Sequence, residues 1–514
     1  MERVYKTSLK FGTGGIREKM GLRPNQMNEK TIGIITQALA NYLKSQYKDS
    51  EIRVSIGYDS RRNSDFFASI SKKVLSSNGI KTYVFTELMP TPVLAYSIEH
   101  LHCQAGIMIT ASHNSKEYNG YKVYGNTGVQ LTPEVAKYIQ QEILNLDYSQ
   151  VLTQENKELE YDVPNTVLEA FLEQVENAIS PIEKKEPITI AFSSLHGASI
   201  QPAKHIFERN GYHNVYYEQD QCIPHQDFPT CPSPNPEEKE AMEKVIELGK
   251  KVNADVVFAT DPDGDRLGVG LKHKNTYTLL SGNEIGVLLY DYLLETKKEG
   301  SKVFKTIVTT DLLDDLAKDH GQQVISVLNG FKYIGDQVNQ LAQQQKEHEF
   351  ILGVEENYGY LVGTYVKDKD SIGALLLFSN LVQYYKNQRK DPLDRLQEIY
   401  EQYGYREQKV ISYTFEGEEG KQKIQDYMEQ LRNANTNNYW IEKYDYQEGI
   451  NNLPKANILK FISKDKDSLI IRPSGTEPKL KLYFSLNSEE LKEFMSTTKP
   501  LDVILEELFD RSAQ

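Results

Sequence analysis

The chain has 514 residues, of which 39% are hydrophobic and 26% are charged, a balance that is ordinary for a folded globular protein. Its length is too great for one hydrophobic core and predicts roughly three or four domains. The net charge of -14 disfavours nucleic acids and anionic membranes as partners, because binders of either usually present a basic surface. A small anionic substrate stays compatible with this charge if arginine and lysine gather locally.

The sequence offers no sign of a membrane or secreted protein. No apolar run approaches the roughly 18 residues needed to cross a bilayer, and residues 1–6 lack the apolar core of a signal peptide. We therefore expect a cytoplasmic location. The three cysteines, Cys103, Cys222 and Cys231, are too few and too scattered for a disulfide framework or a zinc motif, which predicts reduced thiols.

The first predicted elements repeat the order of strand, polar loop and helix. Residues 11–17 are dense in glycine, do not fit a dinucleotide fingerprint, and predict a flexible loop that presents Arg17. Apolar spacing predicts a helix over 29–46, and a strand over 52–56 runs into a polar loop before a helix near residue 65. This alternation is typical of a parallel sheet with helices packed on it.

A serine follows the next buried strand. The apolar run 106–109 predicts a strand that ends where the polar residues begin, so Ser112 would lie at its mouth. His113, Asn114 and Lys122 supply donors and a cation that could hold an anion. Taken alone, the stretch also fits an ordinary turn rich in serine and asparagine.

Further helices and strands lead to a domain boundary that we expect near Ser180. A turn is predicted over 125–128, and helical spacing returns over 133–145 and 167–179. The remaining predicted elements before the next motif are a strand over 188–192, a proline-rich loop over 224–236 and an amphipathic helix over 237–251.

Three carboxylates follow the strand predicted over 256–260. Asp261, Asp263 and Asp265 stand at positions i, i+2 and i+4, a spacing that lets a tight loop point them at one hard cation. An EF-hand is excluded, because its sixth position would be Arg266, its twelfth would be Lys272, and strands flank the loop. A solvated turn is the alternative, although carboxylates this close repel one another unless a cation or an arginine offsets their charge.

The second half of the chain contains two more polar loops after predicted strands. One strand is predicted over 307–310, and another over 350–354 opens into residues 355–360, whose carboxylates, amide and aromatic rings suit a sugar. An acidic surface turn explains that loop equally well. From about residue 403 the pattern predicts a smaller α+β domain, in which a strand over 468–471 feeds a loop over 472–479 that could cradle a phosphate. A turn set by proline and glycine is the alternative there.

Four stretches in this order resemble the α-D-phosphohexomutase family, and more narrowly its bacterial phosphoglucomutase and phosphomannomutase branch. They are Thr-Ala-Ser-His-Asn at 110–114, Asp-Pro-Asp-Gly-Asp-Arg at 261–266, Glu-Glu-Asn at 355–357 and Arg-Pro-Ser-Gly-Thr at 472–476. Residues 11–17, 25–28 and 330–332 are also similar to that family, so the resemblance covers nearly the whole chain.

The resemblance implies an α/β protein of four domains around a central cleft, three similar α/β domains with mixed sheets and a smaller C-terminal α+β domain. We expect the phosphoserine loop in residues 1–180, the metal-binding loop in 181–298, the sugar-binding loop in 299–400 and the phosphate-binding loop in 401–514. Each loop would then belong to a different domain.

The activity implied by the resemblance is that of an isomerase, a phosphoglucomutase. It would interconvert α-D-glucose 1-phosphate and glucose 6-phosphate through a phosphoserine enzyme and glucose 1,6-bisphosphate. Phosphomannomutase and phosphopentomutase remain alternatives, because Asn357 stands where many members have serine and Tyr360 stands near a histidine of some branches, although the doubled glutamate resembles glucose-preferring members. A non-catalytic sugar-phosphate sensor is disfavoured, because it has no use for a phosphate acceptor beside a metal.

The resemblance also implies a role for each matching residue. The expected cofactors are Mg²⁺ and a sugar 1,6-bisphosphate as activator. The expected partner is a small sugar phosphate, and no nucleic acid or membrane is expected to bind. The protein itself is expected to be a monomer or a homodimer. Phosphoryl transfer needs positioning and neutralisation of spread negative charge, which these groups can supply. The implied catalytic residues are Ser112, Arg17, His113 and Lys122; the metal ligands are Asp261, Asp263, Asp265 and the phosphate on Ser112; the substrate-binding residues are Arg266, Lys332, Glu355, Asn357, Arg472, Ser474, Gly475 and Thr476.

Overall fold

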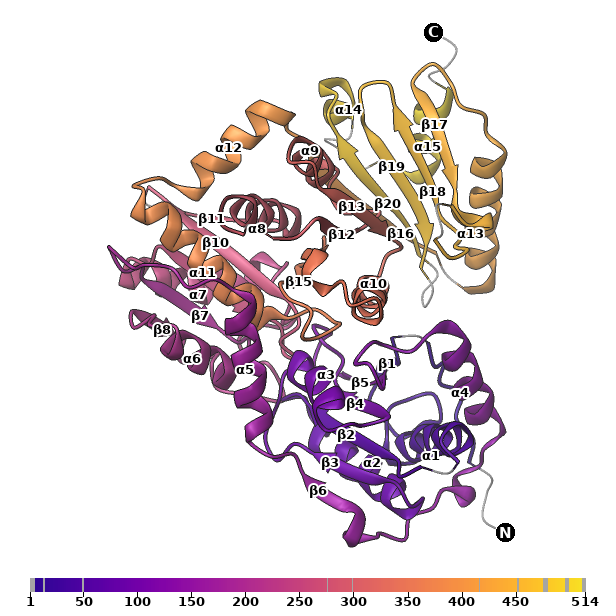
Figure 1. Cartoon of the computed structure of the whole chain (residues 1–514). Helices are drawn as coiled ribbons and strands as arrows, with labels where there is room; N and C mark the ends of the chain where they lie inside the picture. The colour runs from indigo at the N-terminus through magenta and orange to yellow at the C-terminus, as the bar shows by residue number, and fades with distance from the viewer. Residues whose placement is uncertain are drawn as a thin grey trace. The chain divides into compact units, whose positions relative to one another are not determined.

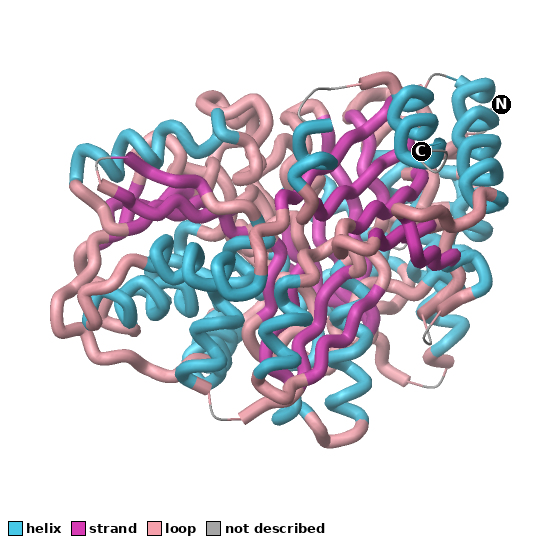
Figure 2. The backbone as a smooth tube through the Cα atoms, turned by 90° about the horizontal axis from the view of Figure 1, so that it is seen from above, coloured by secondary structure: helices cyan, strands magenta, loops and turns pink. Residues whose placement is uncertain are grey.

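The computed structural model describes residues 5–12, 14–48, 50–274, 276–297, 299–415, 417–450, 453–474, 479–494 and 499–510. Helices and strands alternate along the chain (Figure 1), and helices border each group of strands (Figure 2). The chain divides into two compact units. The first comprises residues 1–306, 317–325 and 330–395, and the second comprises residues 307–316, 326–329 and 396–514.

The first sheet of the larger unit is mixed. Its strands lie in the order β1-β5-β4-β2-β3-β6. The pairs between β4, β2, β3 and β6 are parallel, whereas β5 runs antiparallel to both β4 and β1. The strands are β1 (Ile16–Lys19), β2 (Arg53–Tyr58), β3 (Lys81–Val84), β4 (Ala105–Ile109), β5 (Tyr118–Gly125) and β6 (Glu160–Asp162).

Helices cover both faces of this sheet because successive side chains of a strand point to opposite faces. Val54 and Ile56 of β2 belong to the core that α1, α2 and α4 close. On the other face, the hydroxyls of Ser55 and Ser97 lie 2.7 Å apart, which joins β2 to α3. The helices are α1 (Glu29–Gln46), α2 (Ser64–Ser77), α3 (Thr91–His100), α4 (Pro133–Asn145) and α5 (Thr166–Ala178).

The second sheet repeats the mixed pattern. Its order is β11-β10-β9-β7-β8, with β9, β7 and β8 parallel and the hairpin strands β10 and β11 antiparallel. Buried residues of α7, β7 and β9 form its core. The elements are β7 (Ile190–Ser193), α6 (Ile200–Arg209), β8 (Val215–Tyr217), α7 (Lys239–Val252), β9 (Val256–Thr260), β10 (Leu267–His273) and β11 (Thr276–Leu279).

A third sheet has the order β13-β12-β14-β15, and its pairs include parallel β12 with β14 and antiparallel β14 with β15. Helix α11 is almost wholly buried and contacts α5, α6 and α8. The elements are α8 (Gly282–Thr296), β12 (Lys302–Thr306), α9 (Leu312–Asp319), β13 (Gln323–Val327), α10 (Phe331–Gln343), β14 (Phe350–Glu355), β15 (Gly359–Leu361), α11 (Ser371–Asn387) and α12 (Pro392–Tyr403).

The smaller unit contains a sheet in the order β16-β20-β19-β18-β17, all of whose pairs are antiparallel. Trp440 and Phe461 lie fully buried in its core beneath the helices. The elements are β16 (Glu407–Thr414), α13 (Gly417–Asn433), β17 (Trp440–Asp445), β18 (Leu459–Ser463), β19 (Ser468–Pro473), β20 (Lys479–Leu486), α14 (Glu489–Phe494) and α15 (Leu501–Asp510). Short 3-10 turns occur at Tyr148–Gln150, Lys157–Leu159, Glu347–Glu349 and Tyr446–Glu448.

These sheets confirm the predicted fold class, but two local predictions were wrong. Arg17 lies in strand β1, paired with Gly120 of β5, rather than in a flexible loop. The strand predicted over 307–310 is instead β12, which ends at Thr306 and turns at residues 307–309. In the second case two lysines interrupt the apolar pattern of the true strand, so the β-branched run after it gave the stronger signal.

Among the described helices, none combines the length and the apolar composition that a membrane span requires.

Candidate active site

Ser112 lies directly after β4, in the loop that leads to β5. Its backbone φ of 53° is in the left-handed region, which is uncommon for a residue with a side chain. The residue is 1% exposed, and its hydroxyl donates a hydrogen bond of 2.8 Å to Oδ2 of Asp261. The same hydroxyl lies 3.2 Å from Nδ1 of His113. The serine of the first sheet is therefore held at the carboxylate loop of the second.

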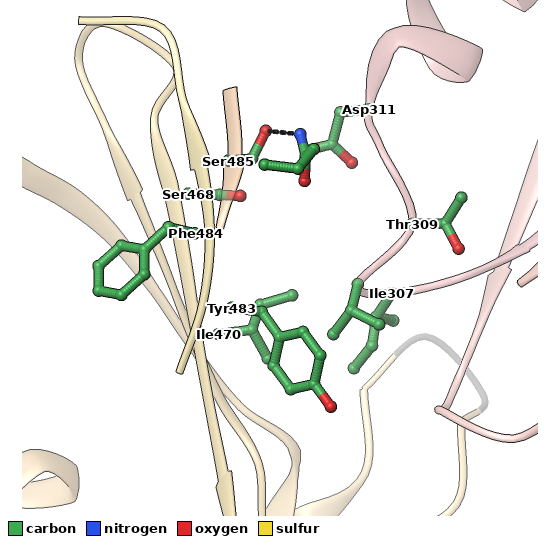
Figure 3. Close-up of a pocket in the computed structure, with 10 residues that line it drawn as sticks. Ile307, Thr309, Asp311, Ser468, Ile470, Tyr483, Phe484 and Ser485 are labelled. Atoms are coloured by element: carbon green, nitrogen blue, oxygen red, sulfur yellow. Dashed lines mark hydrogen bonds between the residues drawn. The ribbon is translucent and has the colours of Figure 1, made fainter. Parts of the chain in front are cut away.

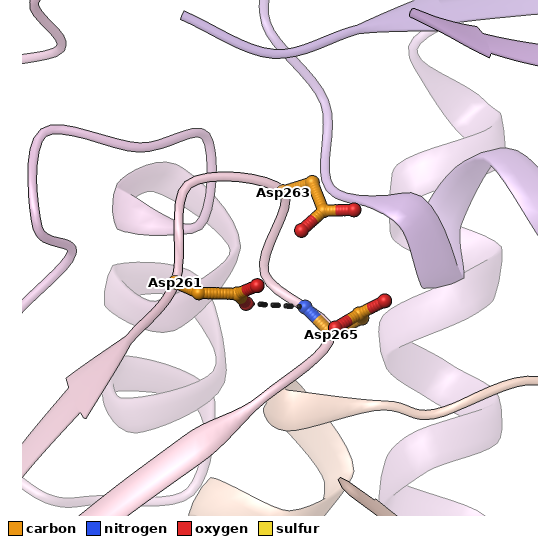
Figure 4. Close-up of side chains that lie close together, drawn as sticks. All are labelled: Asp261, Asp263 and Asp265. Carbon is orange, nitrogen blue, oxygen red and sulfur yellow. Dashed lines mark hydrogen bonds between the residues drawn. The ribbon is translucent and has the colours of Figure 1, made fainter. Parts of the chain in front are cut away.

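The three aspartates lie together in the tight loop between β9 and β10 (Figure 4). All three are buried, and one carboxylate oxygen from each lies within 4.8 Å of the others. The backbone N–H groups of Asp265 and Arg266 donate hydrogen bonds of 3.1 and 3.0 Å to Oδ1 of Asp261. These bonds fix the loop so that its carboxylates converge.

Two buried lysines offset part of this negative charge. Nζ of Lys122, on β5, lies 2.6 Å from Oδ2 of Asp263 and 3.2 Å from Oδ2 of Asp265. Nζ of Lys369, in the segment before α11, lies 3.3 Å from the same oxygen of Asp265. Three sheets thus bring charged side chains to one buried cluster.

The remaining carboxylate oxygens fit a hard cation. Among the described residues, Oδ1 of Asp263 and Oδ1 of Asp265 are buried without a hydrogen-bond partner, a costly arrangement for a charged group. Oδ2 of Asp261 faces the Ser112 hydroxyl. Carboxylate oxygens without nitrogen or sulfur ligands are the donor set of Mg²⁺, Ca²⁺ and Mn²⁺.

Burial and charge shift the pKa values of this cluster. Burial raises the pKa of Asp261 well above its ordinary value, and Asp263 and Asp265 raise it further. Burial also acts to raise the pKa of Asp263, but Lys122, a hydrogen bond with Asp261 and the charge of Arg17 together outweigh this effect, so the pKa is lowered. Burial lowers the pKa of His113 well below its ordinary value, helped by Arg266 and Arg17, so its imidazole is neutral at pH 7.

Arg17 completes the charged surroundings of Ser112. It lies on β1, pairs with Gly120 and keeps an exposed side chain. Its positive charge helps to lower the pKa of Asp263, although burial and Lys122 have larger effects on that pKa. The guanidinium is therefore within electrostatic reach of the aspartates. An accessible cation thus stands beside a buried cluster, as an incoming anion requires.

The loop at residues 355–358 is tied to the aspartate loop. The backbone N–H of Leu267 donates a 3.1 Å hydrogen bond to Tyr358 O, and the backbones of Arg266 and Gly359 form an isolated antiparallel β-bridge. Glu355 is the last residue of β14. The pKa of Arg266 is raised: burial, the largest single effect, acts to lower it, but nearby carboxylates outweigh burial, and Glu355 is one of them. The charge of Glu355 therefore acts on the same site. Tyr360 is buried, and its hydroxyl donates to Gly282 O at 2.9 Å, which withdraws it from any ligand.

Lys332, Arg472 and Ser474 each have contacts of their own. Lys332 is at the start of α10, with Nζ 4.7 Å from the ring centroid of Tyr333. Arg472 is the last residue but one of β19 in the smaller unit, and Ser474 directly follows that strand and donates a 2.8 Å hydrogen bond from its N–H to Lys479 O. Gly475 and Thr476 lie outside the described residues. The structure thus brings together part of the predicted site, namely Arg17, Ser112, His113, Lys122, Asp261, Asp263, Asp265, Arg266 and Glu355.

A pocket in the smaller unit does not compete with this site. It lies between residues 307–311 and the strands β16, β19 and β20, and Ile470 and Tyr483 are among the residues that line it (Figure 3). Gln408 donates a 2.7 Å hydrogen bond to Ser485 at its edge. Its volume of about 10 Å³ has room for about one water molecule and is far too small for a sugar phosphate.

Comparison with known families agrees with the geometry. The domain models of phosphoglucomutase/phosphomannomutase match in order: α/β/α domain I at residues 8–150, domain II at 169–274, domain III at 281–403 and the C-terminal domain at 414–495. A phosphoglucomutase of Staphylococcus haemolyticus is 36% identical over 96% of this chain and 93% of its own length. One of Staphylococcus aureus is 33% identical over 94% and 90%.

The chain belongs to the phosphoglucomutase/phosphomannomutase family. Members of this family are isomerases that transfer phosphate intramolecularly, and this chain is such an enzyme. Solved structures support the fold. A phosphoglucomutase/phosphomannomutase family protein of Burkholderia thailandensis has a TM-score of 0.75 at 16% identity, covering 98% of both chains. The Paramecium phosphoglucomutase parafusin has a TM-score of 0.74 at 20% identity, covering 100% of this chain and 97% of its own.

Two residues of this phosphohexomutase site were missed by the sequence analysis. Thr91 donates to Oδ2 of Asp263 at 2.9 Å through its hydroxyl, and its backbone N–H donates to Asp263 O at 2.8 Å. Lys369 contacts Asp265, as described above. The alternating charges of residues 367–370, directly before the apolar α11, were a usable signal for Lys369. Thr91 lies between two prolines and offered none.

The aspartate loop of the phosphohexomutase rests on Gly197. A Cβ atom at this position would lie 2.4 Å from Cα and 2.6 Å from O of Pro262. We expect Gly197→Ala to destabilise the fold by about 1 to 3 kcal/mol, the usual cost of overpacking, and to displace the aspartates. Thermal unfolding and Mg²⁺ titration measure both effects. Gly125→Ala is the matched control, because its new Cβ would meet nothing closer than 3.8 Å. Equal behaviour of the two variants would contradict this role.

Proposed function

We propose that this phosphohexomutase is a phosphoglucomutase that interconverts α-D-glucose 1-phosphate and glucose 6-phosphate through phosphorylated Ser112 and glucose 1,6-bisphosphate. The observation that carries the proposal is the 2.8 Å hydrogen bond between the Ser112 hydroxyl and Asp261. It sets a phosphate acceptor at a cluster of carboxylates suited to a metal. The names of the relatives that are 33–36% identical support glucose as the sugar.

The chemistry is a relay. The bond between phosphorus and Oγ of Ser112 breaks, and a new bond forms between phosphorus and the free hydroxyl of the sugar monophosphate. The bisphosphate turns over and returns its other phosphate to Ser112. The sugar hydroxyl loses its proton as its oxygen bonds to phosphorus, and Oγ of Ser112 gains a proton as its own bond to phosphorus breaks; the return step reverses both changes. We assign to His113 the transfer of this proton at Oγ, because its neutral Nδ1 lies 3.2 Å from Oγ.

The charged residues have separate tasks in this relay. Asp261, Asp263, Asp265 and the phosphate on Ser112 would hold Mg²⁺. The ion, when bound, neutralises charge on the phosphoryl oxygens. Lys122 and Arg17 supply fixed positive charge beside Ser112, so charge that spreads over the transferring phosphate meets groups already in position.

Substrate recognition is assigned to loops of the later domains. Glu355 and Asn357 would bind sugar hydroxyls, and Arg266 and Lys332 would bind the substrate beside them. Phosphate that does not react would be bound through charge-assisted hydrogen bonds by the loop after β19. The residues proposed for this last role are Arg472, Ser474, Gly475 and Thr476.

A substrate panel tests the sugar assignment. Purified enzyme is assayed with glucose, mannose and ribose 1-phosphates, each with catalytic sugar 1,6-bisphosphate. We expect kcat/KM for glucose 1-phosphate to exceed the others by about tenfold or more, since a site built for particular hydroxyls discriminates strongly against analogues that misplace them. A higher kcat/KM with mannose or ribose 1-phosphate would make the enzyme a phosphomannomutase or phosphopentomutase.

A further inference from the structure

A buried arginine lies beneath the loop of Ser112. The side chain of Arg61, which follows β2, has no exposed surface. Nη1 donates hydrogen bonds to the carbonyl oxygens of Ser115 at 2.9 Å and Tyr118 at 3.3 Å. Nη2 donates to the carbonyl oxygens of Ser112 and Asn114. One guanidinium therefore gathers four carbonyl groups of the loop that carries the proposed phosphate acceptor.

Asp59 anchors this arrangement from below. Its Oδ2 lies 3.3 Å from Nε of Arg61 and accepts a 2.6 Å hydrogen bond from the Thr110 hydroxyl. Thr110 Oγ1 in turn accepts a 2.7 Å hydrogen bond from the N–H of Ser112. The N–H and the carbonyl oxygen of Ser112 are thus held by two groups that both bind the same buried carboxylate.

This double anchor explains the backbone of Ser112. Its φ of 53° is sparsely populated by residues with a side chain and is energetically unfavourable for them. Such a conformation persists only where the surroundings over-determine it. Arg61 and Thr110 supply the required contacts on either side of Ser112, and the strained backbone is what aims its hydroxyl at Asp261.

The same guanidinium reaches the core under the aspartate loop. Its central carbon lies 4.9 Å from the ring centroid of Phe228. Phe228 belongs to a buried cluster that also contains Ala259 of β9, two residues before Asp261. Arg61 therefore contacts both the loop that carries the nucleophile and the core on which the aspartates rest.

We propose that Arg61 is a positioning residue for phosphoryl transfer, which sets the Ser112 hydroxyl relative to the aspartates by gathering the carbonyl groups of residues 112–118. The inference rests on the proposed phosphoserine function. Arginine suits this task, because its planar fork offers five donors in fixed directions, whereas lysine offers one nitrogen on a flexible stem. Charge alone would not reproduce it.

The test compares Arg61→Lys with the matched control Arg62→Lys. Arg62 is the next residue, half-exposed, and pairs with Asp227 at 2.6 Å. Each variant is phosphorylated with glucose 1,6-bisphosphate, and phosphate on Ser112 is followed by intact mass in single-turnover mixtures. Because misplacement of a reacting atom by about 1 Å can cost a hundredfold, we expect phosphorylation and phosphate return both to slow by about thirtyfold or more in Arg61→Lys. KM and the equilibrium occupancy of Ser112 should change less than about threefold, because positioning acts on the barrier of both directions.

The outcomes separate the inference from the function it rests on. Single-turnover rates in Arg61→Lys equal to those of Arg62→Lys, with wild-type enzyme phosphorylated on Ser112, would overturn the role of Arg61 alone. A wild-type enzyme that is fully active without ever carrying phosphate on Ser112 would overturn the proposed function and this inference with it. A change in KM without a change in the transfer rates would also overturn the positioning role.

A second variant covers a failure of Arg61→Lys to fold. Phe228→Leu keeps the carbonyl contacts of Arg61 but removes the ring on its face. We expect its single-turnover transfer rate to fall about three- to tenfold at unchanged KM, with Phe66→Leu, an exposed phenylalanine, as control. Transfer rates of Phe228→Leu that match the control would overturn the proposal.

Discussion

Ser112→Ala is expected to lower kcat by about a thousandfold or more while sugar phosphate still binds. The variant removes the atom that carries phosphate, and removal of a covalent nucleophile typically has effects of this size. Binding should survive because the loops proposed to hold sugar and phosphate lie elsewhere in the sequence. The coupled mutase assay measures kcat, and calorimetric titration with glucose 6-phosphate measures binding.

Ser69→Ala is a suitable control for this variant, because Ser69 is exposed on α2 and its hydroxyl donates to Phe66 O within the same helix. It should retain wild-type activity. Wild-type enzyme should show a phosphate-sized mass increase on a peptide that contains Ser112 and should need bisphosphate for reactivation once dephosphorylated. Substantial activity of Ser112→Ala would rule out the relay and require a direct transfer between sugars.

Asp263→Asn is expected to lower kcat by at least about a hundredfold, the scale of losing a preorganised electrostatic contact. Chelation of divalent metal should abolish turnover of the wild-type enzyme, and Mg²⁺ should restore it. Calorimetric titration should show Mg²⁺ affinity reduced at least about tenfold, because even partners behind the ligands typically change affinity by 10- to 100-fold. This second measurement does not depend on activity.

The control for the metal site is Asp220→Asn, which removes a carboxylate from an exposed ion pair with Lys244. Exposed pairs contribute little to stability, so turnover and Mg²⁺ affinity should stay near those of the wild type. Normal turnover of wild-type enzyme in excess chelator would contradict a metal-dependent reaction. Unchanged Mg²⁺ affinity in Asp263→Asn would instead place the ion at a different site.

Sequence reasoning worked where the signal was local. The helices predicted over 29–46 and 133–145 have the same bounds as α1 and α4, because their apolar spacing and N-terminal residues are short-range features. The strand before Ser112 ended as predicted, at the change from apolar to polar residues. The aspartates converge because their spacing of two already fits one tight loop.

What could not be predicted depends on contacts distant in sequence. Arg17 is held in a strand by pairing with Gly120, and no property of residues 11–17 announces that partner. Arg61 looked like part of a polar loop, since a buried guanidinium reveals itself only through the carbonyls around it. For Lys369 the alternating charges of residues 367–370 were a local signal, but its partner Asp265, which lies more than a hundred residues away, was not predictable from them.

The pairing of Lys122 and Lys369 with Asp265 has a consequence for how the protein is made. During translation the aspartate loop emerges after the strand of Lys122 but about a hundred residues before Lys369. A ribosome-bound chain that ends soon after residue 265 therefore holds a carboxylate cluster with only one of its two ammonium neighbours. The aspartate cluster gains its second ammonium neighbour only after residue 369 has been synthesised and has packed against it. Chains truncated before that residue should therefore bind divalent ions with a different affinity from the full chain.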